Sequence, residues 1–147
     1  MADFLIREIE KGIGNTGIRP GIIKYASGAP AISKIETMLL QAVTLAHRAT
    51  GIPILTHTNM GLGGPEQQRA FLGNGVSAHR CLIGHCCQNP NPGYHHCIAA
   101  AGSYVGFDRI GLLRHQSDEV RADNVVRLAR AGHADRMIDA VLRTCPP

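Results

Sequence analysis

Three short apolar runs recur along the chain, and each leads into a residue that carries a nitrogen base. The runs are residues 21–24, 53–58 and 81–85, and their bases are Lys24, His57 and His85. A short apolar run between Gly or Pro turn signals is typical of a strand buried on both faces, as in a parallel sheet. The pattern therefore predicts three parallel strands that each present one basic side chain.

The spacing of these bases favours successive strand–helix units. Lys24 and His57 are 33 residues apart, and His57 and His85 are 28 residues apart. Each separation is close to the roughly 30 residues of one βαβ unit. Parallel strands of successive units end at the same edge of a sheet, where α/β folds carry their chemistry. We expect the three bases at the same height on one rim.

Helical periodicity fills the segments between the runs. Ser33 and Glu36 form a capping-box pattern at the start of one helix. Further on, residues 103–107 predict a fourth strand that ends in Asp108 and Arg109, and residues 135–138 look like a fifth strand that does not complete. The predicted helices are residues 3–11, 33–51, 65–73, 94–101 and 118–132.

Regular alternation of strand and helix predicts an α/β fold with parallel strands. Chemistry at neighbouring strand ends favours a (β/α)8 barrel over an open doubly wound sheet. A complete barrel takes about 250 residues, whereas this chain has 147. We therefore expect one partial barrel domain over residues 1–147, roughly strands 4 to 7 with their helices, with sheet edges left open.

Composition excludes several classes of protein. A hydrophobic content of 44% and a charged content of 18% are ordinary for a globular domain. No apolar run is as long as a membrane span or a signal-peptide core, so we expect a cytoplasmic protein without a membrane partner. The net charge of +4 is spread among acidic residues, which argues against a nucleic-acid partner. Five cysteines without a CxxC spacing indicate reduced thiols, and His95, His96 and Cys97 with Cys86 and Cys87 fit no standard zinc finger.

Four ordered segments resemble the phosphotriesterase family of the amidohydrolase superfamily, including its lactonase-like branch. The resemblance covers residues 1–134, and residues 135–147 diverge from the family pattern. It implies a zinc-dependent hydrolase that attacks phosphotriester or lactone bonds with a metal-bound hydroxide at the mouth of a (β/α)8 barrel. The segments are residues 17–24, 51–58, 83–85 and 106–111.

The resemblance also implies the site residues. Lys24 would be carboxylated and bridge two divalent ions, while His57 and His85 would bind the second ion. Arg109 would contact the substrate or pair with Asp108, and Asp139 would be the catalytic aspartate of the last strand. The family's His-x-His pair does not occur in this sequence. Glu66 and Gln67 also match the family and are expected to be helix-start residues.

The chemistry of these residue types agrees with the resemblance. Burial lowers the pKa of a strand-end lysine, so its neutral amine can react with carbon dioxide. Imidazole nitrogens are common zinc ligands, and a metal-bound water ionises near neutral pH. Two alternatives remain open. In the first, the chain is a non-catalytic remnant that folds, if at all, by self-association. In the second, two half-barrels pair into one closed barrel as a homodimer. An active chain is expected to take a small-molecule ester or lactone as its substrate.

Overall fold

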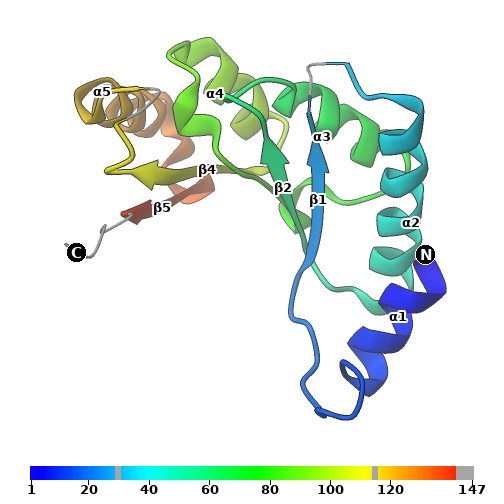
Figure 1. Cartoon of the computed structure of the whole chain (residues 1–147). Helices are drawn as coiled ribbons and strands as arrows, with labels where there is room; N and C mark the ends of the chain where they lie inside the picture. Colours follow the sequence, from blue (N-terminus) through cyan, green and yellow to red (C-terminus); the bar gives the residue numbers. More distant parts are fainter. Residues whose placement is uncertain (29–30, 114–115, 142–147) are drawn as a thin grey trace.

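The computed structural model describes residues 1–28, 31–113 and 116–141. Five strands form one parallel sheet in the order β1-β2-β3-β4-β5, and the main helices cover one side of it (Figure 1). The strands are β1 (Ile23–Ser27), β2 (Ile54–Thr58), β3 (Cys81–Ile83), β4 (Tyr104–Ile110) and β5 (Met137–Val141). The α-helices are α1 (Ala2–Lys11), α2 (Lys34–Thr50), α3 (Gly64–Gly73), α4 (Pro92–Ala100) and α5 (Asp118–Leu128). Four short turns complete the chain, namely η1 (Ala78–Arg80), η2 (Cys86–Gln88), η3 (Ala129–His133) and η4 (Ala134–Arg136).

The strand order identifies the architecture. Each strand pairs with the one that follows it in the sequence, and every pairing is parallel. In a doubly wound sheet the strand order reverses at a switch point, whereas in a (β/α) barrel each new strand is added on the same side of the previous one. The prediction of an α/β partial barrel is therefore confirmed.

One face of the sheet is buried and the other is open. Along β1, Ile23, Tyr25 and Ser27 are buried, whereas Lys24 and Ala26 are exposed. The prediction of strands buried on both faces is thus wrong for the inner face, because the described strands form an open wall and not a closed barrel. The open face is called the concave face below.

The core lies between the sheet and its helices. Ile54, Ile83 and Phe107 of three strands are fully buried there against Phe71 of α3 and Ile98 of α4. Burying a side chain of this size contributes about 1.5–3 kcal/mol. This layer therefore holds the strands in place and leaves the concave face free for polar groups.

Helix α2 has the ends that the sequence predicts. Ser33 Oγ accepts a hydrogen bond from the Glu36 backbone N–H at 3.3 Å, and Glu36 Oε2 accepts one from the Ser33 backbone N–H at 2.7 Å. Gly51 ends the helix in a left-handed conformation with φ 72°. The capping box is confirmed at the start of α2, and Gly51 marks where the chain turns toward β2.

Strand lengths differ from the prediction at three places. β1 continues past Lys24 to Ser27, and β4 continues through Asp108 and Arg109 to Ile110. β5, which was expected not to complete, is five residues long and pairs with β4. Pairing with a neighbour supplies hydrogen bonds that the local sequence does not reveal, so it extends strands beyond their apolar runs.

The last helix is irregular near the end that the sequence predicts. α5 ends at Leu128, and the π-helical turn η3 continues the helical path from Ala129. Gly132, with φ 89°, breaks the helical geometry inside this turn. Among the described helices, none has the length and apolarity needed to cross a bilayer.

Candidate functional site

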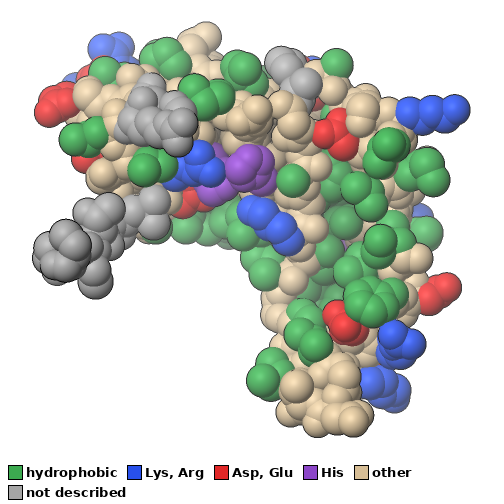
Figure 2. Space-filling model, in the orientation of Figure 1, with side chains coloured by type: hydrophobic (Ala, Val, Ile, Leu, Met, Phe, Trp, Pro, Cys, Tyr) green, Lys and Arg blue, Asp and Glu red, His purple; other side chains and the backbone are tan. Residues whose placement is uncertain are grey.

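Four of the predicted site residues gather on the concave face. Lys24 comes from β1, His57 from β2, His85 from the residues after β3, and Arg109 from β4. Figure 2 shows histidine side chains in the hollow of this face with basic side chains on either side of them. These groups lie close enough to interact, since the charges of His85, Arg109 and Lys24 all lower the pKa of His57.

The strand registers correct the prediction that the bases lie at one height. Lys24 is paired with Leu55, and Ala26 is paired with His57. The backbone of Lys24 therefore lies two residues closer to the N-terminal ends of the strands than the backbone of His57 does. Its long side chain reaches upward along β2, where Nζ donates a hydrogen bond of 3.0 Å to the Thr56 carbonyl oxygen.

The two histidine rings lie in direct contact. Their centroids are 4.6 Å apart and the planes meet edge to face at 80°. Desolvation lowers the pKa of His57, and the positive charge of His85 on protonation lowers it further. The His57 imidazole is therefore held neutral at neutral pH, which is the form that binds a metal.

His85 is fixed by a carboxylate. Asp108 Oδ1 accepts hydrogen bonds from the His85 backbone N–H at 3.0 Å and from His85 Nδ1 at 2.9 Å. Because an ionised carboxylate only accepts, Nδ1 carries the hydrogen and the lone pair of Nε2 is free. Burial raises the pKa of Asp108, but the hydrogen bonds and charge of His85 outweigh burial and hold that pKa below its usual range.

The environment of Lys24 lowers the pKa of its amine. Its side chain is exposed on the concave face, yet the amine rests against β2 and is partly desolvated. Desolvation lowers the pKa of Lys24, the Asp108 charge raises it, and the Arg109 charge lowers it again. The net pKa lies below the usual lysine value, which increases the fraction of nucleophilic free amine.

Arg109 does not pair with its neighbour in the sequence. Its Nη1 donates a hydrogen bond of 2.9 Å to Gln88 Oε1 in η2. The predicted pairing of Asp108 with Arg109 is wrong, because Asp108 is occupied by His85. A guanidinium held by an uncharged amide keeps its positive charge available to a ligand on the concave face.

Gln67 is a site-building residue that sequence reasoning missed. The side chain is fully buried, and Nε2 donates to Ser27 Oγ at 2.6 Å and to the His57 carbonyl oxygen at 2.8 Å. It therefore ties the ends of β1 and β2 together beneath the site. Glu66, by contrast, is a surface residue of α3 that pairs with Arg69.

The structure does not bring Asp139 to this cluster. Asp139 is paired in register with Phe107, whose ring is fully buried on the helix-covered face. Paired residues of parallel strands point to the same side of a sheet. Asp139 therefore belongs to the opposite face from Lys24, and β5 presents Ile138, the partner of Gly106, to the concave face.

Within the described ranges, the other histidines and cysteines form no group of three or more metal ligands. His95 is buried, and its Nε2 lies 2.9 Å from the Cys86 carbonyl oxygen. Cys86 and Cys87 are buried free thiols whose pKa values are raised by burial. Protonated thiols are poor metal ligands. Cys145 lies outside the described residues.

The donor set of the concave face fits one divalent metal only when Lys24 contributes an oxygen. In the part of the chain that the structure describes, no three His, Cys, Asp or Glu side chains are grouped closely enough to hold a metal. His57 and His85 supply two imidazoles, and a carboxylated Lys24 would supply the third ligand. Three protein ligands with an open position are the usual set of a catalytic zinc.

Comparison with known proteins gives consistent results. The model of the phosphotriesterase family matches residues 1–142, past the point where the sequence resemblance was expected to end. A phosphotriesterase homology protein of Mycobacterium tuberculosis is 43% identical over 139 residues, which cover 94% of this chain and 43% of that protein. An aryldialkylphosphatase of Saccharolobus solfataricus is 34% identical over 94% of this chain and 44% of its own length.

A solved structure shares the fold closely. The organophosphorus hydrolase of Deinococcus radiodurans superposes with a TM-score of 0.91 at 33% identity, over 99% of this chain and 47% of that one. This chain thus spans less than half the length of these relatives.

Proposed function

The chain belongs to the phosphotriesterase family, and from this premise we propose that it carries the lysine and two-histidine part of a zinc-dependent hydrolase centre. The members named above include enzymes that hydrolyse ester bonds. The observation that supports the proposal best is the convergence of Lys24, His57 and His85 on one open face, with the two rings 4.6 Å apart. The substrate class is a phosphotriester or a lactone.

Each residue has a distinct task in this proposal. His57 and His85 provide neutral nitrogen ligands, and Asp108 sets the ring orientation and tautomer of His85. Lys24, carboxylated by carbon dioxide, provides the oxygen ligand. A divalent ion bound there lowers the pKa of a coordinated water and polarises a phosphoryl or carbonyl oxygen.

Arg109 is proposed to orient the substrate. Its guanidinium is anchored by Gln88 and lies close enough to Lys24 and His57 to lower the pKa of both. Guanidinium groups hydrogen-bond well to phosphoryl and carboxyl oxygens. The same group suits a tetrahedral phosphotriester and a lactone carbonyl, so Arg109 does not select between them.

The test measures carboxylation of Lys24 directly. The chain is incubated with zinc and ¹³C-bicarbonate, and a carbamate carbon signal is sought by NMR. We expect the signal and a bicarbonate-dependent zinc uptake in the native chain and in Lys34→Ala, an exposed lysine of α2. Both should be lost in Lys24→Ala. An equal carbamate signal or zinc uptake in Lys24→Ala would refute the assignment.

A non-catalytic chain is the competing function, and the position of Asp139 favours it. Asp139 lies on the face opposite the cluster, so the described residues supply no aspartate there to shuttle a proton besides Asp108, which His85 occupies. Hydrolysis of a lactone or an aryl phosphotriester by the zinc-loaded chain, lost in His57→Ala, would eliminate this alternative. Zinc uptake without hydrolysis of either ester would favour it.

A further inference from the structure

A second pair of histidines lies far from the concave face. His96 is exposed on α4, and His133 ends the π-helical turn η3. His133 Nε2 lies 3.2 Å from His96 Nδ1, and the ring centroids are 4.9 Å apart. The residues are 37 positions apart in the sequence, so the fold alone brings them together.

We propose that His96 and His133 form a surface site for a divalent transition metal of the zinc class, which clamps α4 to the turn that leads into β5. Zinc–nitrogen bonds are about 2.0–2.1 Å, so two imidazoles on one tetrahedral ion have their nitrogens about 3.3 Å apart. In the structure the two nitrogens form a hydrogen bond of 3.2 Å, a separation close to this value. A bound ion would replace the shared hydrogen.

The local backbone explains why His133 reaches α4. Gly132 at φ 89° breaks the helical geometry and redirects the chain immediately before His133. Without this break, His133 would continue around the axis of α5.

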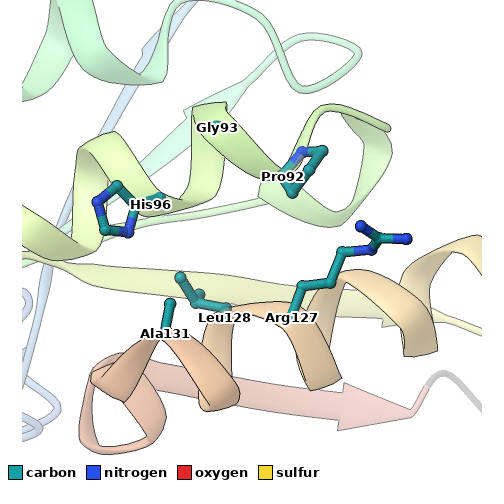
Figure 3. A pocket seen from close by; sticks show the side chains of 6 residues that line it. All are labelled: Pro92, Gly93, His96, Arg127, Leu128 and Ala131. Atoms are coloured by element: carbon teal, nitrogen blue, oxygen red, sulfur yellow. The ribbon is translucent and has the colours of Figure 1, made fainter.

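The surroundings leave room for the remaining ligands. His96 lines a cavity of about 230 Å³ between α4 and the end of α5, shown in Figure 3 beside Leu128 and Ala131. Water in this cavity can complete the coordination of an ion held by two nitrogens. Arg127, the cation at the cavity wall, is paired with Asp123 at 2.6 Å, which reduces its repulsion of a metal ion.

Zinc binding tests the proposal once the concave-face centre is disabled. In a His57→Ala chain, calorimetric titration is expected to show one zinc per chain, and adding His96→Ala or His133→Ala should weaken that binding at least tenfold. Adding His79→Ala, an exposed histidine of η1, should change nothing. Mg²⁺ at the same concentrations should bind to none of these chains, because it prefers oxygen ligands.

The clamp also predicts a local effect on β5. Zinc should slow amide hydrogen exchange of residues 137–141 in the His57→Ala chain, and His96→Ala should abolish this protection. Zinc affinity that is unchanged by His96→Ala and by His133→Ala would overturn the proposal. A stoichiometry of one zinc per two chains would also overturn it, because the ion would then join separate molecules.

Discussion

His85 has an unusual backbone conformation for its residue type. Its φ of 61° lies in the left-handed region, which costs a non-glycine residue about 1–3 kcal/mol. The two hydrogen bonds to Asp108 involve a charged acceptor and offset this cost. Asp108 therefore fixes both the backbone and the ring of a proposed metal ligand.

Substitution of Asp108 tests this positioning. Asp108→Asn keeps the size of the side chain but removes its charge. It replaces the carboxylate that accepts both hydrogen bonds from His85 with a neutral amide. We expect the bicarbonate-dependent zinc affinity to fall about 10- to 100-fold, as is usual when the partner of a metal-bound histidine is lost. Zinc titration followed by circular dichroism checks binding and fold together. Glu66→Gln, which breaks only the surface pair with Arg69, is the control and should leave affinity unchanged.

The residues of the site differ in how predictable they are. Lys24, His57 and His85 could be found because each follows an apolar strand at a regular spacing. The partner of Asp108 could not, since His85 lies 23 residues away in the sequence and adjacency to Arg109 does not make a pair. Gln67 was missed for a similar reason, because its partner Ser27 lies 40 residues away in the sequence.

At the scale of elements, Gly84 sets how closely β2 and β3 approach. A Cβ on Gly84 would overlap with the Thr56 carbonyl oxygen, and it would also come within 3.3 Å of Asp108 Oδ2. The same Thr56 oxygen accepts the hydrogen bond from Lys24. The absence of a side chain at residue 84 thus allows three strands to bring their polar groups together.

Adding one methyl group at this position should disturb both fold and site. Gly84→Ala is expected to lower the free energy of unfolding by about 1–3 kcal/mol, the usual cost of overpacking a core, and to weaken bicarbonate-dependent zinc uptake. Gly73→Ala is the matched control, because a Cβ there meets open space at the end of α3. Urea unfolding of both variants gives the comparison. Equal stability of Gly84→Ala and the native chain would show that the strands can move apart freely.

Element boundaries that are set by a short stretch of sequence were predictable, whereas boundaries that are set by pairing with another strand were not. The Ser33 capping box determines the start of α2 within four residues of sequence, so it is visible without a fold. The full length of β5 is recognisable only through its pairing with β4, where Met137 lies beside Val105.

At the scale of the whole molecule, the main features are the open concave face and the two outer strands of the sheet, β1 and β5. Among the described residues, β1 and β5 each pair with a single neighbour, which leaves one backbone edge of each strand available. Unpaired edges of this kind favour association with another chain. The chain of 147 residues is therefore expected to self-associate, and we propose that two copies pair through these edges and concave faces.

A charge on the concave face should separate the two copies. Ile138 is 41% exposed, so Ile138→Lys places a cation on the proposed interface and is expected to weaken dimerisation at least tenfold. Val126→Lys adds the same charge at a 43% exposed position of α5 and should have no effect. Analytical ultracentrifugation over a range of concentrations measures the association. A native chain that sediments as a monomer throughout the range would refute the pairing.

The strictly sequential order of the strands has a consequence for biosynthesis. Ile23 of β1 meets Ile54 of β2, and each later strand likewise adds to one that has already left the ribosome. Among the described strands, each one after β1 meets a neighbour that has already been made. The sheet can therefore be assembled unit by unit during translation, with each new helix covering the strand made just before it.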